Sequence, residues 1–525
     1  MAVNTLTFTA ITLAYLALVI ILGYMGYCKT KEHEDYLVAG RKIHPVVLAL
    51  SYGATFISTS AIVGFGGSAA QLGMGLIWLT VFNIGVGILI AFVIFGRKTR
   101  QIGNQLKAVT FPDLLGKRYQ SSFMQGASGL VILVGMPLYT AAILIGGARF
   151  IETTLNIPYD TALIGFAAIV AAYVVLGGLI AVMYTDALQG SIMLVGMTLL
   201  LILTYVMLGG VMEAHTALGS LSGLVSEGLA AAGHTGWTSM PVLGSSIWLT
   251  LVTTLVLGVG IGVLAQPQLA VRFMTVKDTR SINRAVAVGG PFILMMTGVA
   301  FTVGALTNVY FYRTAGMTAL EAAGGNVDSI IPMYINAAMP DTFVIIFMLA
   351  LLAAAMSTLS SLFHTMGTAL GHDLWTSRKN LKPSLRANQI GCLFMIVVSV
   401  IVAYMLPGSI IARATAMFMG LCASAFLPAY AHALYSEHPS CRAAVASLVL
   451  GAATWFLWTA FVHVKESAMM GLSSLLFGVD AILPMPWQAV DPLIIALPVS
   501  IITLGGVLVY ERAEARKAAQ HTETA

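Results

Sequence analysis

Residues 351–375 read LLAAAMSTLSSLFHTMGTALGHDLW, an apolar run that is long enough to cross a bilayer and carries several hydroxyl groups. At about 100° per residue, its polar side chains fall on one helical face, with Ser360 at the edge. Polar stripes inside membrane helices face a neighbouring helix or a water-lined path, and they mark routes for ions or solutes. The alternative is that the hydroxyls only bond to their own backbone or join helices together. The face comprises Ala354, Ser357, Thr358, Ser361, His364, Thr365, Thr368 and His372.

The composition indicates a polytopic membrane protein. Of the 525 residues, 58% are hydrophobic and only 9% are charged, and the mean hydropathy is +0.91. These values lie far from those of soluble globular proteins. Apolar runs of about 20 residues recur along the chain, which is the length that a helix needs to cross a bilayer. The alternating pattern of an outer-membrane barrel does not occur, so we expect an all-α protein in the cell (inner) membrane.

We expect thirteen transmembrane helices, an odd number that places the two chain ends on opposite sides. Most of the 26 Lys and Arg residues, Arg272 among them, fall in segments that lie inside if the chain starts outside. The positive-inside rule therefore predicts the N-terminus outside and the C-terminus inside. The first span lacks preceding basic residues and a cleavage site, which indicates an uncleaved anchor. The expected spans are 6–27, 45–72, 75–95, 123–151, 160–180, 183–209, 245–266, 287–311, 342–372, 388–406, 410–434, 443–464 and 491–511.

Two of these spans cluster glycine with polar residues and are poor continuous helices. The second contains SYGATFISTSAIVGFGGSAAQLGMG, and the seventh contains TTLVLGVGIGVLAQPQ. Broken membrane helices are tolerated only where the freed backbone groups line a cavity or are buried in protein. The two spans occupy matching positions in two five-helix halves, a pattern typical of the central site of an inverted-repeat transporter. The alternative is that the glycines only allow close packing.

A break at residues 54–57 would free carbonyl groups, and Ser357 and Thr358 would bring hydroxyls to them. Together they form an uncharged oxygen cage, which suits sodium better than calcium because calcium usually takes carboxylate ligands. Asp186 lies inside the sixth span, where ionisable groups are rare and mark function. It would join Ser357, Ser360 and Ser361 around a second cation, or else stand as an N-terminal helix charge at the inner interface.

Nothing in the sequence indicates an enzyme. There is no His and Cys metal spacing, no nucleophile elbow and no phosphate-binding glycine loop. The four cysteines lie in or beside expected helices, so we predict no disulfide and no metal cluster. The net charge of +5 records loop topology, and we expect no nucleic-acid partner and no cofactor other than a coupling ion.

Five motifs, in order, resemble the sodium:solute symporter family over about residues 14–451. They are DYLVAGRKI, SYGATFISTSAIVGFGGSAAQLGMG, GGLIAVMYTDALQG, QPQLAVRFMTVKD and AAAMSTLSS. The resemblance implies a LeuT-like inverted-repeat fold of five plus five helices. It divides the chain into an extra N-terminal helix with its inner loop (1–44), a first repeat (45–210), an external loop (211–244), a second repeat (245–435), and two further helices with a short tail (436–525).

The same resemblance implies specific ion ligands. The family's sodium site falls on the carbonyls of Ala54 and Ile57 and on Ala354, Ser357 and Thr358. A further sodium site of some members matches the set Asp186, Ser357, Ser360 and Ser361.

The substrate of the proline branch fits poorly, because Phe56 replaces that branch's aspartate and Val259 and Val263 replace its Trp and Tyr. Residues 146–166 look most like the pantothenate branch, which implies a small carboxylate guided by Arg149 or Arg413. By position, we expect the solute pocket to be lined by Phe56, Ser58, Thr59, Trp78, Asn83, Tyr139, Thr254, Val259, Met417 and Cys422.

We therefore predict a sodium-coupled symporter, a monomer in the lipid bilayer, that imports a small organic solute by alternating access. The alternatives are a proton-coupled symporter using Asp186 or His364, and a symporter-like sensor acting with a separate signalling partner.

Overall fold

The computed structural model describes residues 5–376, 384–406 and 410–523, and these residues fold almost entirely into helices. Within these residues, eleven helices are long and apolar enough to cross a membrane, or up to twelve if the bent pair within residues 45–72 counts as one span. A shorter apolar helix covers Tyr159–Val175. The all-helical class is therefore confirmed, while the number of thirteen spans, the five domain boundaries and the sides of the chain ends stay predictions.

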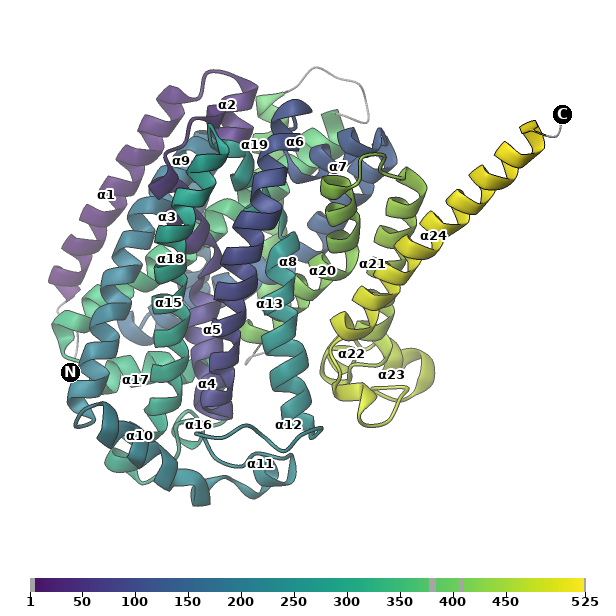
Figure 1. The fold of residues 1–525 in the computed structure, drawn as a ribbon. Helices are drawn as coiled ribbons and strands as arrows, with labels where there is room; N and C mark the ends of the chain where they lie inside the picture. Colours follow the sequence, from purple (N-terminus) through teal and green to yellow (C-terminus); the bar gives the residue numbers. More distant parts are fainter. Residues whose placement is uncertain (1–4, 377–383, 407–409, 524–525) are drawn as a thin grey trace.

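One group of α-helices accounts for most of the bundle in Figure 1. They are α1 (Thr5–Lys29), α3 (Pro45–Phe56), α4 (Phe65–Leu72), α5 (Ile77–Ile84), α6 (Arg97–Gln105), α8 (Ser122–Leu155), α9 (Tyr159–Met207), α15 (Thr279–Ala315), α18 (Asp341–Thr368), α19 (Leu385–Met405), α20 (Ile411–Tyr435), α21 (Cys441–Phe461) and α24 (Pro492–Glu523). The other α-helices are α2 (His33–Val38), α7 (Phe111–Tyr119), α10 (Val211–Ser220), α11 (Glu227–Ala231), α12 (Ser246–Leu249), α13 (Val259–Gly262), α14 (Pro267–Ala270), α16 (Ala319–Ala322), α17 (Ile330–Ala338), α22 (Val464–Met470) and α23 (Leu472–Phe477).

The second predicted span is broken, as its sequence indicates. Helix α3 ends at Phe56, and Ile57 adopts an extended conformation with φ −91° and ψ 93°. A π-helical stretch, Ser60–Gly64, then leads into α4, and the two halves meet at an angle of 52°. The break leaves carbonyl groups at the end of α3 without partners in their own helix, and they are buried inside the protein.

The seventh predicted span does not break at mid-depth, which corrects the prediction. One helical run covers Ser246–Ala265, but it passes from α12 through a π-helical stretch, Thr250–Gly258, to α13 and a 3₁₀ turn, Val263–Ala265. The chain stays helical through these changes of winding, so this span has no extended residue in its middle like Ile57 in the second span. A Cβ on Gly262 would lie 2.6 Å from the Met419 carbonyl oxygen. The glycines here therefore allow close packing on α20, which is the alternative that the sequence left open.

Helix α9 contains the boundary between the fifth and sixth predicted spans. At Gly178 the backbone has φ 59° and ψ −168°, so the helix is interrupted there. Only glycine fits, because a Cβ would also lie 2.5 Å from the Tyr36 ring. The second half of α9 carries Asp186 about two turns beyond this interruption.

Helix α18 lies at the centre of the molecule. In its most apolar window 78% of the residues are buried, against 22% for α1 and 17% for α24, which lie at the periphery (Figure 1). It packs against α3, α8, α9 and α19. The polar stripe of residues 351–375 therefore faces protein.

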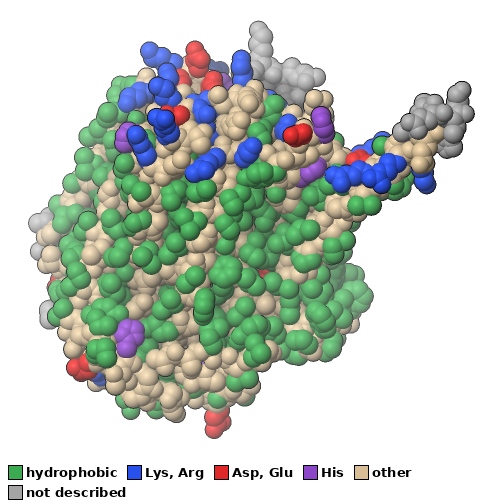
Figure 2. Space-filling model, in the orientation of Figure 1, with side chains coloured by type: hydrophobic (Ala, Val, Ile, Leu, Met, Phe, Trp, Pro, Cys, Tyr) green, Lys and Arg blue, Asp and Glu red, His purple; other side chains and the backbone are tan. Residues whose placement is uncertain are grey.

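Charged residues gather at one end of the molecule. Figure 2 shows hydrophobic side chains around its middle and Lys and Arg at the end where Figure 1 places α2, α6 and α7. By the positive-inside rule, this end is expected to face the cytoplasm.

Candidate functional site

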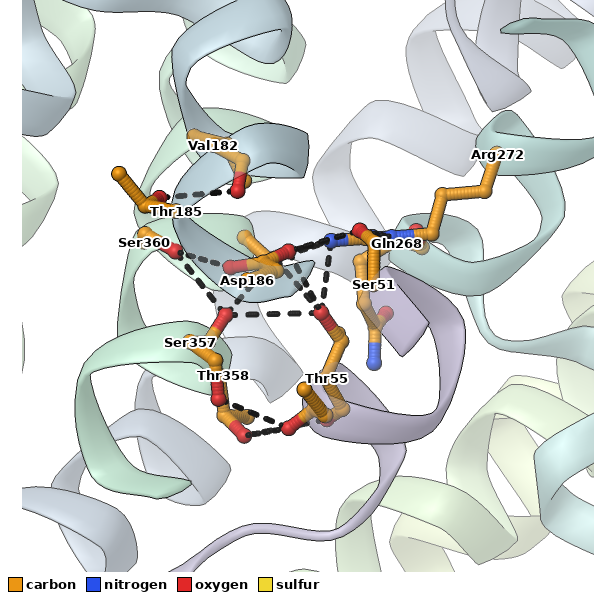
Figure 3. Close-up of polar contacts among 12 residues, drawn as sticks. Ser51, Thr55, Val182, Thr185, Asp186, Gln268, Arg272, Ser357, Thr358 and Ser360 are labelled. Atoms are coloured by element: carbon orange, nitrogen blue, oxygen red, sulfur yellow. Dashed lines mark hydrogen bonds and ion pairs between the residues drawn. The ribbon is translucent and has the colours of Figure 1, made fainter. Parts of the chain in front are cut away.

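Two hydroxyls of α18 contact the broken end of α3. Ser357 Oγ donates to the Ala54 carbonyl at 2.8 Å and lies 3.1 Å from the Ala354 carbonyl. Thr358 Oγ1 lies 3.1 Å from the carbonyls of both Thr55 and Ala354 and 3.4 Å from that of Ala54. The structure thus brings together four of the five predicted sodium ligands, and Figure 3 shows Ser357 and Thr358 among them.

The fifth ligand, Ile57, is buried directly after the end of α3, three residues beyond Ala54. We call this set the carbonyl site: Ala54, Ile57, Ala354, Ser357 and Thr358. It carries no charged side chain. A hydroxyl has one proton and two lone pairs, so Ser357 and Thr358 can turn their protons away and offer oxygen to a cation. A monovalent cation at this site would be bound by oxygens of both α3 and α18. These are the oxygens that hydrogen bonds link in the structure.

A second polar cluster lies one helical turn along α18, and it is charged. Asp186 is fully buried, and its Oδ2 lies 2.8 Å from Nη2 of Arg272. Ser51 Oγ and Thr55 Oγ1, one turn apart on α3, donate to the same carboxylate oxygen at 2.8 and 3.3 Å. Ser360 Oγ approaches Oδ1 at 3.4 Å.

Of the second predicted sodium set, Asp186, Ser360 and Ser361 converge in this cluster. The hydroxyl of Ser357 points instead to the carbonyl site, although its carbonyl accepts hydrogen bonds from Ser360 Oγ and Ser361 Oγ at 2.9 and 3.0 Å. Whether either set binds sodium stays a prediction. The carboxyl of Asp186 is buried within the protein, and its depth relative to the inner interface stays a prediction.

Arg272 is the residue that the sequence reasoning missed. It was grouped with the basic residues of an inner loop, yet only 1% of its surface is exposed. The chain re-enters the protein through α14 and the 3₁₀ stretch Val271–Thr275, which places Arg272 beside α3, α9 and α18. The available signal is that most of its neighbours in PQLAV and FMTV are apolar and none is charged, whereas arginines of solvated loops usually lie among polar residues.

The predicted solute pocket corresponds to a small cavity of about 20 Å³ beside the break. Such a cavity has room for about one water molecule. Five of the ten predicted residues line it, namely Phe56, Ser58, Asn83, Tyr139 and Val259. Other lining residues that the sequence did not indicate are Ile57, Ala61, Phe65, Leu79, Thr297, Phe301, Thr415 and Met419.

The other five predicted pocket residues lie elsewhere. Trp78 is 55% exposed on the outer surface of the bundle, because α5 turns this side of its helix away from the core. Thr59 is buried with its hydroxyl 3.4 Å from the Ile143 carbonyl. The remaining three are buried outside the lining of this cavity: Thr254, Met417 and Cys422.

The polar groups of the cavity lining are uncharged. Asn83 is 2% exposed, and within the described residues its Oδ1 has no hydrogen-bond partner. The Tyr139 hydroxyl bonds with Ser58 at the break. An unpartnered buried carbonyl favours a ligand that brings a donor, since leaving it unpaired costs about 1–3 kcal/mol.

A larger cavity of about 580 Å³ lies at the end of the molecule away from α6 and α7. Arg413 lines it and forms an ion pair with Glu466 at 2.9 Å, and Lys465 lines it as well. Arg149, the other predicted anion guide, does not line this cavity. It pairs with Glu152 at 2.8 Å and stacks on the Tyr159 ring.

His364 is buried in the wall of α18, with Nε2 3.0 Å from the Tyr36 carbonyl. A neutral ring that donates to this carbonyl is already satisfied there. The contact supports a packing role for His364 more than a proton-carrying one.

A model of the sodium:solute symporter family matches residues 36–451. The sodium/pantothenate symporter of Haemophilus influenzae is 28% identical over 87% of this chain and 92% of its own length. The sodium/proline symporter of Escherichia coli is 25% identical over 85% of this chain and 86% of its own length.

Solved structures support the fold. A sodium-coupled sialic acid symporter in a substrate-bound outward-open state superposes with a TM-score of 0.73 over 95% of each chain, at 16% identity. Mhp1, a nucleobase-cation-symport-1 family transporter, superposes with a TM-score of 0.52 over 90% of this chain and 94% of its own, at 14% identity. The fold thus has LeuT-like neighbours, as the resemblance implies.

Proposed function

The chain belongs to the sodium:solute symporter family, whose members are membrane transporters and not enzymes, and we propose that it imports a small organic solute with sodium. The observation that carries this proposal is the contact of Ser357 and Thr358 with the carbonyls at the end of α3. We place the protein in the cell membrane, as a monomer with its basic end inside.

The coupling follows from which elements the cation would join. Sodium at the carbonyl site holds the α3 break against α18, and the same break lines the solute cavity through Phe56, Ile57 and Ser58. Binding of the ion therefore fixes the wall that the solute needs. When the inner side opens and α18 moves from α3, the ion loses ligands from both helices and leaves.

The two cavities support alternating access. The solute cavity of about 20 Å³ is too small for an organic molecule, whereas the cavity beside Arg413 measures about 580 Å³. In the proposed cycle, a solute enters the larger cavity first and reaches the smaller one only when the outer helices separate. In this proposal the structure represents a step at which the smaller cavity has no room for the solute.

The driving force is sufficient for concentrative uptake. At about 100 mV, one inward positive charge supplies about 2.3 kcal/mol, and a tenfold sodium gradient adds about 1.4 kcal/mol. One ion therefore supports a solute gradient of roughly several hundredfold.

We propose a small carboxylate of the pantothenate or monocarboxylic acid type as the solute. The pantothenate symporter among the relatives supports this class, as does Arg413 in the larger cavity. The smaller cavity has no charged residue in its described lining, so the remainder of the solute would be uncharged and would carry a hydrogen-bond donor for Asn83 Oδ1.

Thermal unfolding of the purified protein tests the solute class. A ligand that binds only the folded state raises its stability by mass action. We expect a small carboxylate to raise the melting temperature in sodium but not in potassium. Stabilisation by amino acids or sugars alone would replace the proposed class, and no sodium dependence with any ligand would contradict symport.

Uptake into proteoliposomes tests the coupling itself. We expect Ser357→Ala to weaken sodium-driven uptake while the protein still inserts. The matched control is Ser399→Ala, because Ser399 is equally buried but donates only to Met395 of its own helix. Unchanged sodium dependence in Ser357→Ala would contradict the assignment of the carbonyl site.

A further inference from the structure

The second predicted cation site, around Asp186, already contains a positively charged side chain of the protein, that of Arg272. Nη2 of Arg272 lies 2.8 Å from Asp186 Oδ2 and 2.6 Å from Thr55 Oγ1 (Figure 3). The same nitrogen also contacts Ser361 Oγ. These oxygens come from three different helices and all approach one guanidinium nitrogen.

The guanidinium group is held firmly. Its Nε donates to Ser51 Oγ at 3.0 Å, and its Nη1 donates to the Gln268 carbonyl at 2.5 Å. The backbone on either side is fixed as well, because Thr275 Oγ1 donates to the Arg272 carbonyl at 2.7 Å. With 1% exposure, Arg272 cannot exchange its partners for water without local opening.

A sodium ion and this guanidinium cannot share the site. Arginine stays protonated in proteins, so a metal ion among the same oxygens would face a second positive charge at contact distance. Buried like charges repel strongly because little solvent screens them. One carboxylate, Asp186, neutralises one cation, and the other groups within hydrogen-bond distance of that carboxylate are uncharged hydroxyls.

We propose that Arg272 is the resident cation of the second site, and that the protein therefore binds a single sodium ion, at the carbonyl site. This inference rests on the proposed function. Its consequence is a coupling ratio of one sodium per solute, which limits accumulation to the gradient that one ion supports. The positioning role of Arg272 is to join the stretch Val271–Thr275 to α3, α9 and α18 without an ion.

The stoichiometry of sodium binding tests this inference without knowledge of the solute. Purified protein in lipid nanodiscs is titrated with radioactive sodium, and bound ion is counted per chain. We expect the wild type to bind one ion with a Hill coefficient close to one. We expect Arg272→Gln, which leaves Asp186 facing hydroxyls alone, to bind a second ion.

Two further variants separate charge from folding. Arg272→Lys keeps the positive charge and is expected to bind one ion. The double variant Asp186→Asn with Arg272→Gln removes both charges and is also expected to bind one ion, which shows that the extra site of Arg272→Gln needs the carboxylate. A folded Arg272→Gln variant that binds only one ion would contradict the proposal.

The wild-type count is decisive even if every variant fails to fold. Two ions per wild-type chain would overturn the inference and leave the proposed symport intact. No bound sodium at all would overturn the proposed function itself.

Discussion

The carbonyl site and the Asp186–Arg272 cluster lie one helical turn apart on α18 and bury polar groups in opposite ways. In the first, uncharged hydroxyls donate to uncharged carbonyls. In the second, a carboxylate and a guanidinium neutralise each other among hydroxyls. The comparison teaches that a cluster of oxygen atoms does not by itself indicate a sodium site. A sodium ion binds favourably only where the protein has not already placed a positive side chain among those oxygens.

The largest effect is expected from breaking the charged cluster. Asp186→Ala would leave the Arg272 guanidinium buried without a counter-ion, which typically costs about 3–5 kcal/mol. Unfolding of the detergent-solubilised protein by heat measures the loss. Replacing both residues together, Asp186→Leu with Arg272→Met, should restore much of it, because an apolar pair carries no desolvation cost. Equal loss in the single and double variants would contradict the ion pair as its cause.

The second largest effect is expected on sodium affinity, from a substitution in the carbonyl site. Thr358→Val removes a hydroxyl that contacts three carbonyls while it keeps the shape of the side chain. If the lost oxygen contributes about 1–3 kcal/mol to the free energy of sodium binding, its removal weakens sodium affinity by roughly 5- to 150-fold. Sodium titration of thermal stability measures it, with Thr358→Ser as the control that keeps the oxygen. Wild-type affinity in Thr358→Val would remove this site from the account.

Ser361→Ala is the complementary test, because Ser361 lies one turn from Ser357 and belongs to the charged cluster. Its effects on stability and on sodium affinity are compared with those of Thr358→Val. Ser361 contacts Arg272 and lies 3.0 Å from Thr55 Oγ1, so its loss should lower stability by about 1–3 kcal/mol. Sodium affinity should change less than in Thr358→Val, because Ser361 is not a ligand of the carbonyl site. A larger loss of sodium affinity in Ser361→Ala than in Thr358→Val would reverse the roles of the two clusters.

The smallest effect concerns pH and lies outside both clusters. His234, in the loop before α12, accepts from the Gly236 N–H through Nδ1, while its Nε2 lies 3.0 Å from the Gln71 carbonyl. Burial lowers the pKa of this ring, so the unfolded chain binds the proton more readily. Stability should therefore fall as the pH drops below about 6.5, and sodium affinity at the carbonyl site should not follow it.

His234→Gln, which keeps a polar side chain, should lose part of this pH dependence. Unfolding curves between about pH 5 and pH 8 measure it. The same slope in the variant and the wild type would assign the effect to another group.

Local features of the sequence predicted much of the site. The cluster of glycine and hydroxyl residues in GATFISTS predicted the break after α3, because such residues favour an interrupted helix. The polar stripe of residues 351–375 predicted a buried α18, because a bilayer does not accept hydroxyls on its lipid side. Both predictions needed only the chemistry of neighbouring residues.

The features that sequence reasoning missed depend on contacts between distant segments. In the sequence, Arg272 follows Pro267 and has the position of a loop residue. In the structure it is surrounded by three other helices, α3, α9 and α18. Trp78 and Asn83 lie on the same helix, yet only Asn83 faces the cavity, because packing sets the rotation of α5. The π-helical winding of residues 250–258 could not be predicted from composition, because an α-helix and a π-helix can have the same apolar residues.

Amide hydrogen exchange tests most directly whether a sodium ion joins α3 to α18. It is measured on residues 50–60 and 351–362, in sodium and in potassium. We predict that sodium slows exchange in both segments together, that potassium does not, and that Thr358→Val abolishes the effect. Exchange in these two segments that is the same in sodium and potassium, while sodium still drives uptake, would contradict the account.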